Sequence, residues 1–485
     1  MEESLKNKAV NGVSWSMTKS VVTYAVHFIV GIILARLLSP DDYGLIGLIM
    51  IFTAIADCIT ISGFFSSLIQ KKNANEDDYN TMFVSNMVSS TFMYLLLFFG
   101  APFIAKFFNR IELINLVRVQ SLSLVISAFS LVQRARLNKQ LDFKTPTKVA
   151  IITSLFSGVF GITMAFCGCG VWSLVIPNVA SSILSAIMYC CYNKWIPQFR
   201  FSIVSFKALF GYGWKILIAE LFDCIFMQTY QFVVGKFYSP ATLGQYTRGK
   251  GFSDLISTNI YNMTRDVTFP VLSQLQTDKE RSKDAFRKMV RMLMFITVIP
   301  LFGMAAVAKP MILVLIGEKW LPSVFFLQIL CFGSLLYPIN ATNMNLLKSQ
   351  GRSDFYLVLS LIRKFLEIGP ICLGVFVDIK WMVLGMVINN WIGFFIYSHY
   401  AGKTIGYSSM RQFIDLLPSI GIAAAMAVPV WLLSFLPINS SILILVMQLT
   451  AGCILTIMLC KTTGIQEYKE AKEIAVGYIK RFFRR

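Results

Sequence analysis

Long runs of apolar residues alternate with short polar segments along the whole chain. An α-helix needs about 20 mostly apolar residues to cross the hydrocarbon core of a bilayer. The apolar residues form continuous runs and do not alternate with polar ones, which favours helices over strands. These runs predict about fourteen transmembrane helices, near residues 12–38, 43–69, 81–104, 112–132, 147–168, 171–192, 208–235, 243–272, 287–308, 323–347, 355–376, 381–401, 413–436 and 440–460. The pattern therefore predicts an all-α integral membrane protein.

The composition agrees with this prediction and excludes other classes. Of 485 residues, 56% are hydrophobic and only 14% are charged, whereas soluble domains have about 45–50% apolar and about 25% charged residues. The net charge of +19 does not indicate nucleic-acid binding, because the basic residues lie in short segments between apolar runs and form no known nucleic-acid-binding pattern. The ten cysteines lie mostly in apolar stretches, so neither a metal site nor a disulfide framework is expected.

Lysine and arginine are distributed unevenly between the two sets of predicted loops. The set that includes both termini carries most of the 44 basic residues. The opposite set carries only Arg36, Lys106, Arg110, Lys236, Lys309, Lys319 and Lys380. Because basic loops stay on the cytoplasmic side, we expect a multi-pass protein of a cytoplasmic membrane with both termini in the cytoplasm.

The last segment differs from the predicted spans. Ile465, Tyr468 and Ala471 begin an apolar helical face that continues toward the C-terminus, while lysines such as Lys469 and Lys472 lie largely elsewhere. This pattern is typical of an interfacial amphipathic helix on anionic lipid. A solvated tail is the alternative. We therefore assign residues 462–485 to a cytoplasmic basic amphipathic tail.

Two short motifs recur at an offset of about 200 residues. Gly-x-x-Trp at 12–15 and Ser-Pro-x-x-x-Gly at 39–44 return at 211–214 and 239–244. Six predicted helices separate the copies, so both copies run in the same direction through the membrane, as in parallel transporter repeats. We expect an N-terminal six-helix lobe over 1–206, a C-terminal six-helix lobe over 207–402 and two additional helices over 403–461.

The repeated segments also resemble a known family. Residues 35–44, Ala-Arg-Leu-Leu-Ser-Pro-Asp-Asp-Tyr-Gly, are similar to the segment after the first helix of bacterial polysaccharide flippases. Gly-Gln-Tyr at 244–246, Phe-Pro-Val-Leu-Ser at 269–273 and Leu-Gln at 275–276 resemble the same family. These are the polysaccharide transporters of the multidrug/oligosaccharidyl-lipid/polysaccharide (MOP) flippase superfamily, which include Wzx-type O-antigen, colanic acid and teichuronic acid exporters. The resemblance implies fourteen helices in two six-helix lobes plus two trailing helices, and an undecaprenyl-pyrophosphate-linked oligosaccharide as cargo.

Charged residues inside the predicted helices are the candidate site residues, because a charge at bilayer depth costs about 2.5–3.5 kcal/mol on insertion scales. Given the resemblance, the helices near 12–38, 43–69, 208–235 and 243–272 are expected to line a cationic cavity. The candidates for binding the carrier pyrophosphate are Lys215, Arg248, Lys250, Arg265 and Arg36. The candidates for ion coupling are Asp57, Glu220, Asp223 and His27.

Each of these assignments has a structural alternative. Basic side chains near helix ends can reach the lipid headgroups instead of a cavity. For His27, a satisfied, buried histidine is favoured over a role in ion coupling. Arg363 and Glu367, four residues apart, are expected to pair with each other.

No P-loop, nucleophile elbow or metal-ligand cluster occurs in the sequence, so we expect neither an enzyme nor a cofactor. The hypothesis is a flippase that moves a lipid-linked oligosaccharide by alternating access for surface polysaccharide, including lipopolysaccharide, biosynthesis. Its expected partners are that carrier, membrane lipids, a polysaccharide polymerase and other assembly proteins, but no nucleic acid. The alternatives are a flippase for a lipid-linked peptidoglycan precursor and a cation-coupled multidrug antiporter of the same superfamily.

Overall fold

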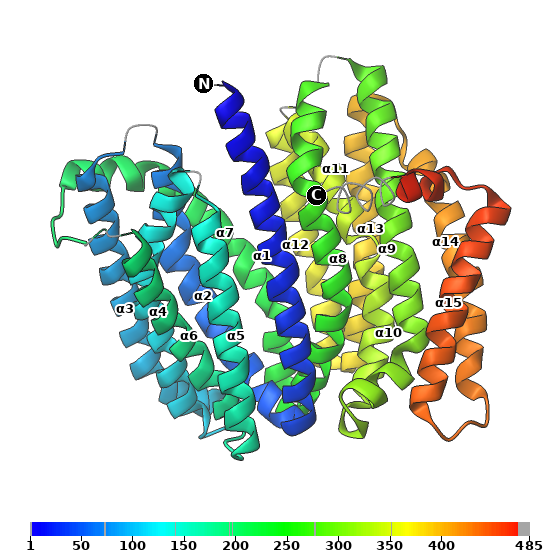
Figure 1. The fold of residues 1–485 in the computed structure, drawn as a ribbon, viewed down its shortest axis with the longest axis horizontal. Coiled ribbons are helices and arrows are strands. Elements are labelled where there is room, and N and C mark those ends of the chain that lie inside the picture. The colour runs from blue at the N-terminus through cyan, green and yellow to red at the C-terminus, as the bar shows by residue number, and fades with distance from the viewer. Residues whose placement is uncertain are drawn as a thin grey trace. The chain divides into compact units, whose positions relative to one another are not determined.

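The computed structural model describes residues 2–71, 74–140, 142–193, 195, 197–275, 278–350 and 352–473. All regular elements in these ranges are helices, which confirms the all-α prediction (Figure 1). They are α1 Glu2–Leu37, α2 Pro40–Gln70, α3 Glu76–Phe108, α4 Leu113–Lys139, α5 Lys144–Phe166, α6 Trp172–Asn193, α7 Ile203–Phe237, α8 Pro240–Gln274, α9 Lys279–Leu315, α10 Ser323–Ser334, α11 Tyr337–Ser349, α12 Ser353–Phe376, α13 Ile379–Ile405, α14 Ser409–Leu432 and α15 Ser441–Thr463, with 3-10 turns at Glu318–Trp320 and Leu433–Phe435.

Within this described part of the chain, twelve helical segments are long and apolar enough to cross a membrane. α10 and α11 count as one such segment, Ser323–Ser349. The sequence predicts a single helix here, but the structure interrupts it at residues 335–336, just before Pro338. α8 and α12, which carry several charges, are not among the twelve, so the total of fourteen spans stays a prediction.

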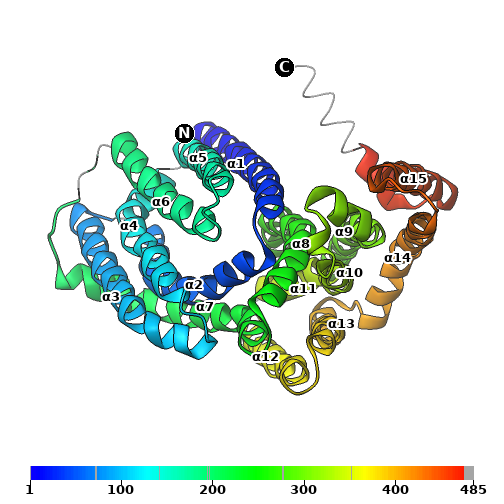
Figure 2. The same cartoon turned by 90° about the horizontal axis from the view of Figure 1, so that it is seen from below.

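The chain forms two compact units, Met1–Gly244 and Gln245–Arg485. In the first unit, α2 packs most extensively against α7, α3 against α4, and α6 against α4 and α5. α1 packs along α5. Figure 2 shows α1, α2, α4, α5 and α6 arranged around a common interior. The predicted lobes at 1–206 and 207–402 stay predictions, although α7 packs within the first unit.

The two Ser-Pro-x-x-x-Gly motifs start α2 and α8 in the same way. Ser39 caps α2 by accepting a hydrogen bond from the backbone N–H of Asp42 at 3.2 Å, and Ser239 does the same for Thr242 at 3.1 Å. Proline at the first helical position has its φ preset and needs no hydrogen bond there. The repeated serine and proline are thus explained as helix starts.

The glycines of the same motifs lie where these two helix starts meet. A Cβ atom on Gly44 would lie 1.8 Å from the carbonyl oxygen of Pro240, and one on Gly244 would lie 2.0 Å from that of Pro40. Because backbone atoms cannot move aside as side-chain ends do, only glycine fits at either position. The repeated sequence therefore forms a reciprocal backbone contact.

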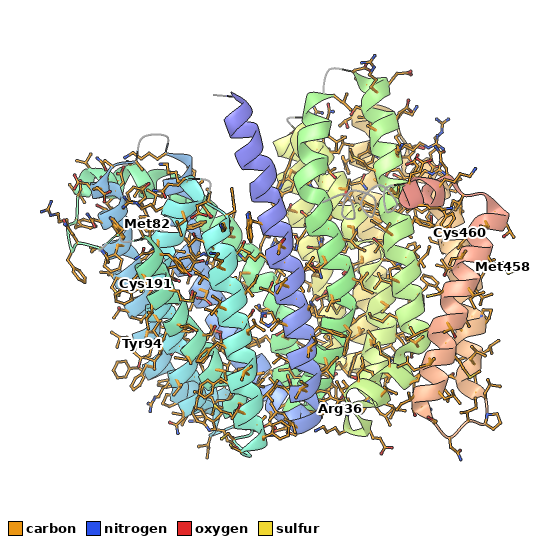
Figure 3. The ribbon with its side chains drawn as sticks, in the orientation of Figure 1. Arg36, Met82, Tyr94, Cys191, Met458 and Cys460 are labelled. Atoms are coloured by element: carbon orange, nitrogen blue, oxygen red, sulfur yellow. The ribbon has the colours of Figure 1, made fainter. Side chains whose placement is uncertain are left out.

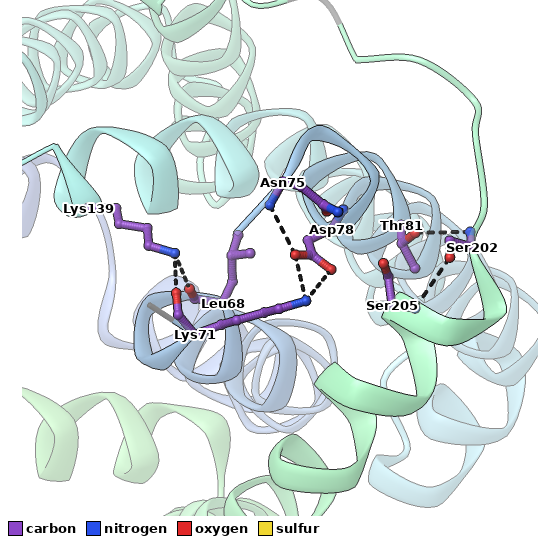
Figure 4. A network of polar contacts seen from close by, with 8 residues as sticks. All are labelled: Leu68, Lys71, Asn75, Asp78, Thr81, Lys139, Ser202 and Ser205. Atoms are coloured by element: carbon purple, nitrogen blue, oxygen red, sulfur yellow. Dashed lines mark hydrogen bonds and ion pairs between the residues drawn. The ribbon is translucent and has the colours of Figure 1, made fainter. Parts of the chain in front are cut away.

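A polar network joins four helices, α2, α3, α4 and α7, at one end of the first unit (Figure 4). The Asp78 carboxylate is fully buried and pairs with Lys71 Nζ at 2.7 Å. Lys139 Nζ, from the end of α4, donates to the backbone carbonyl of Leu68 at 3.3 Å and to that of Lys71. The backbone N–H of Ser202, just before α7, donates to Thr81 Oγ1 at 3.1 Å. The network fixes the ends of α2, α4 and α7 around α3.

In the second unit, α9 packs against α10, α14 and α15, and α13 packs against α11 and α12. The first part of the tail continues this packing, since Ile465, Tyr468 and Ala471 join a cluster with Phe295 and Ile422. The described part of the predicted amphipathic face thus lies on protein. Residues 474–485 of the tail lie outside the described residues.

Candidate functional site

The first unit has an open, polar cavity of about 340 Å³ among five of its helices. Its lining residues come from α1, α2, α4, α5 and α6: Lys19, Asp57, Ile61, Ser127, Ser130, Leu131, Arg134, Val149, Ala150, Thr153, Ser181, Ser182, Ser185 and Tyr189. Most of these lining side chains are polar or charged, so the five helices bring polar groups together at this cavity. We call this space the unit 1 cavity.

Three charged side chains line the unit 1 cavity. Asp57 supplies the single carboxylate among the lining residues, and Lys19 and Arg134 supply two cations. Arg134 interacts electrostatically with both Lys19 and the buried Tyr189. Charges inside membrane helices are costly unless they meet water, a partner or a ligand. An excess of one positive charge makes this cavity suited to an anionic group.

Hydroxyl groups make up most of the remaining polar surface. Several donate their proton to a backbone carbonyl of the unit: Ser130 Oγ to Ser127 at 2.9 Å, Thr153 Oγ1 to Val149 at 2.8 Å and Ser181 Oγ to Thr153 at 3.3 Å. A hydroxyl that has donated its proton keeps lone pairs for accepting. The cavity can therefore accept hydrogen bonds from water or from the hydroxyls of a ligand.

Of the residues predicted in the first unit, only Asp57 lines the cavity. Arg36 is exposed at the end of α1 (Figure 3). His27 on α1 is exposed, as are Lys215, Glu220 and Asp223 on α7. These five side chains are thus exposed, and none of them is among the residues that line the unit 1 cavity.

The predicted residues of α8 lie in the second unit and have local partners. The guanidinium of Arg248 lies 5.8 Å from the ring of Trp320, which is fully buried. Lys250 pairs with Asp254 at 2.5 Å, four residues along the helix. The side chain of Arg265 lies outside the described residues. On α12, Arg363 pairs with Glu367 at 3.2 Å, which confirms that prediction.

Sequence reasoning missed most of the residues that line the unit 1 cavity. Lys19, inside the predicted span near 12–38, and Arg134, just after the span near 112–132, were not among the candidate site residues, yet both line the cavity. The serines offered a signal, since Ser181, Ser182 and Ser185 repeat at helical spacing on an otherwise apolar span. Tyr189 continues that face one turn further on.

The chain also matches known proteins. Residues 33–325 match the family model described as "Polysaccharide biosynthesis protein". The teichuronic acid biosynthesis protein TuaB of Bacillus subtilis is 24% identical over 72% of this chain and 73% of its own length. The lipopolysaccharide biosynthesis protein WzxC of Escherichia coli is 22% identical over 85% of this chain and 84% of its own. The succinoglycan biosynthesis transport protein ExoT of Rhizobium meliloti is 23% identical over 75% and 73%.

Solved structures share the fold. The lipid II flippase MurJ, in an inward closed conformation, aligns with a TM-score of 0.72 and 15% identity, covering 92% of this chain and 98% of MurJ. An inward-facing multidrug resistance MATE family transporter of the MOP superfamily aligns with a TM-score of 0.61 and 16% identity, covering 81% and 95%. At this identity the similarity is evidence for the fold alone.

Proposed function

Because this chain belongs to the polysaccharide biosynthesis protein family, we propose that it is a flippase that moves an undecaprenyl-pyrophosphate-linked oligosaccharide across the cytoplasmic membrane. The observation that carries the proposal is the family match over residues 33–325, which include the segments at 35–44 and 244–276 that carry the resemblance. The resemblance to polysaccharide transporters of the MOP superfamily is confirmed. The names of three relatives, TuaB, WzxC and ExoT, describe surface polysaccharide biosynthesis or transport.

The charges within the helices support this cargo. A pyrophosphate with attached sugars crosses hydrocarbon only if a polar path replaces its hydration. Lys215, Arg248, Lys250, Arg265 and Arg36 are the proposed contacts for the pyrophosphate, since basic side chains form charge-assisted hydrogen bonds to phosphate. The hydroxyl-lined unit 1 cavity adds a polar interior within one lobe. The lipid tail stays in the bilayer throughout.

The repeat suggests how the path opens on alternate sides. Two like-oriented lobes can move against each other around a shared site, and the paired motifs at the starts of α2 and α8 provide matching elements in the two copies. We place both termini in the cytoplasm, with Asp57, Glu220, Asp223 and His27 as ion-coupling candidates. The polymerase and other assembly proteins remain the proposed downstream partners.

Export of surface polysaccharide in cells tests the proposed contacts. In cells whose own flippase is deleted, we expect this chain to restore export and Lys215→Ala and Arg265→Ala each to reduce it at least about tenfold, a loss of about 1.4 kcal/mol of cargo stabilisation. Lys207→Ala is the matched control, because Lys207 is an exposed lysine earlier on α7. Membrane levels of each variant are measured by immunoblot.

Full export by both variants would remove Lys215 and Arg265 from the site. Two further arms address the alternative cargoes. Rescue of cells that lack their peptidoglycan-precursor flippase would favour that cargo, and resistance to cationic drugs without polysaccharide export would favour an antiporter.

A further inference from the structure

A second cavity, of about 460 Å³, lies in the second unit at the ends of four helices. It is lined by Lys279 at the start of α9, Gln350 after α11, Arg352 and Phe355 around the start of α12, and Tyr400, Lys403 and Thr404 near the end of α13. None of these residues belongs to the unit 1 cavity or to the proposed cargo contacts. We call this space the basic pocket.

The basic pocket carries three cations and no carboxylate among its lining residues. In the described part of the chain, no ion pair involves Lys279, Arg352 or Lys403, although acids lie nearby in sequence. Asp278 instead caps α9 and pairs with Arg281 at 3.3 Å. Three like charges around one concavity repel one another, and an anion bound among them relieves that repulsion.

The other lining groups, an amide and two aromatic rings, suit an anion that also has uncharged polar or apolar atoms. The guanidinium of Arg352 lies 4.8 Å from the ring of Phe355, and this ring lies 5.5 Å from that of Tyr400. The aromatic pair holds the guanidinium at one wall, where its planar fork can bind two phosphate oxygens. The Gln350 amide and the Tyr400 hydroxyl add neutral hydrogen-bond donors.

We propose that the basic pocket binds a phosphate-bearing anion of headgroup size. Its volume lies within the range of about 300–1,000 Å³ that is typical of small-ligand sites. The same chemistry fits the phosphate of an anionic lipid headgroup and a soluble phosphate or pyrophosphate. All four helix ends lie on the side that the loop charges predict to be cytoplasmic, where both sources are available. The proposal does not depend on the identity of the transported cargo.

Binding of inorganic pyrophosphate to the purified full-length chain in a neutral detergent tests the soluble source. We expect saturable binding by calorimetry that weakens as salt rises. The double variant Arg352→Gln/Lys403→Gln should raise the dissociation constant at least tenfold, and Lys279→Gln alone should raise it several-fold. The matched control, Arg411→Gln/Lys461→Gln, removes two exposed cations on the predicted same side outside the pocket and should leave binding unchanged.

Nanodiscs of phosphatidylcholine with and without phosphatidylglycerol test the lipid source. Native mass spectrometry should count fewer retained phosphatidylglycerol molecules on the pocket double variant than on the control variant. Loss of either anion from the pocket variant alone supports the site and identifies its source. Equal binding of both anions by the pocket and control variants, or no saturable binding of either to the wild-type chain, would overturn the proposal.

Discussion

At the scale of single residues, the unit 1 cavity combines charges of both signs. Asp57 is the one acidic residue among the groups lining the unit 1 cavity, and it shares that cavity with Lys19 and Arg134. Because nearby cations favour the ionised form of a carboxylate, any change in the position of Lys19 or Arg134 would change the affinity of Asp57 for a proton or a metal cation. This makes Asp57 the strongest of the four ion-coupling candidates.

Replacing Asp57 with asparagine should therefore uncouple transport from an ion gradient. We expect Asp57→Asn to keep its fold and to lose at least about tenfold of the gradient-driven rate, which corresponds to about 1.4 kcal/mol. Transport in proteoliposomes with and without an imposed proton or sodium gradient measures this effect. Asp354→Asn, at an exposed carboxylate early in α12, is the control, and equal gradient dependence in Asp57→Asn and wild type would contradict the assignment.

Asp78 is expected to stabilise the folded chain through its buried contacts at the start of α3. Its carboxylate is fully buried, accepts from Lys71 and caps the start of α3. Asp78→Asn should lower the free energy of unfolding by about 1–3 kcal/mol, less than the 3–5 kcal/mol typical of a broken buried pair because Lys71 is partly exposed. Thermal unfolding in detergent measures the loss, and Asp77→Asn, at the exposed neighbouring carboxylate, should leave the midpoint unchanged.

At the scale of elements, glycines determine how closely the helices of the first unit approach. A Cβ on Gly213 of α7 would lie 2.6 Å from the carbonyl oxygen of Gly63 on α2. Ser67 Oγ, on the same face of α2, donates to the Leu209 carbonyl at 2.9 Å. Gly213, at a variable position within the second Gly-x-x-Trp copy, thus marks a helix contact, as small residues commonly do in membranes.

The two glycines of this segment, Gly211 and Gly213, give opposite predictions. Gly213→Ala should destabilise the chain by about 1–3 kcal/mol, because the added methyl group overlaps backbone. Gly211→Ala should be neutral or stabilising by up to about 1 kcal/mol, because nothing lies within 4 Å of its Cβ position and alanine favours helix. Thermal unfolding of the two variants side by side tests this contact, and equal midpoints would contradict the close packing of α2 and α7.

The start of the tail is held on α9 by ion pairs of different burial. Arg291 pairs with Glu467, whose side chain is only 7% exposed, while Lys288 pairs with Glu470 at 2.9 Å in a more exposed position. A double-mutant cycle of Arg291→Gln and Glu467→Gln should give a coupling free energy of about 1–3 kcal/mol. The Lys288–Glu470 cycle should give under about 1 kcal/mol, and the reverse order would argue against the described docking.

Tyr407 belongs to the same end of the unit and lies outside the predicted spans. Burial raises the pKa of its phenol, and the hydrogen bond that its hydroxyl donates to Asp415 raises the pKa further. The Asp415 carboxylate also accepts two hydrogen bonds from Arg287, one from Nε and one from Nη2, each at 2.7 Å. The phenol therefore stays protonated in the folded chain, and its contribution to stability falls only as the pH rises above the pKa of an unfolded tyrosine, about 10.

At the scale of the whole molecule, the sequence predicts the helices well and the cavities poorly. Long apolar runs are a local signal, so most of the predicted spans match the observed helices within a few residues. The unit 1 cavity depends on which faces of five helices meet. Tertiary packing determines these faces, and no single stretch of sequence predicts them. Lys19 and Arg134 were therefore not among the candidate site residues, and the basic pocket, assembled from four helix ends, was not anticipated.

The internal repeat was predicted in part, better than the cavities but less completely than the helices. Its motifs were recognised from residues 39–44 and 239–244, but only the structure shows that Gly44 and Gly244 contact each other's helix start. The sequence predicted only that the motif repeats, and the structure shows that the two copies are in backbone contact. The glycines are required by this contact, whereas the serine and proline are explained by helix initiation alone.

The central claim is that this chain carries a lipid-linked oligosaccharide from one leaflet to the other. Its most direct test is a reconstituted assay in which a membrane-impermeant glycosidase attacks undecaprenyl-pyrophosphate-linked oligosaccharide in proteoliposomes. With the wild-type chain we expect the accessible fraction to grow from the outer leaflet to the whole pool, while protein-free liposomes keep the inner-leaflet pool protected. Continued protection in the presence of folded protein, or equal transport of a cationic drug in its place, would contradict the account.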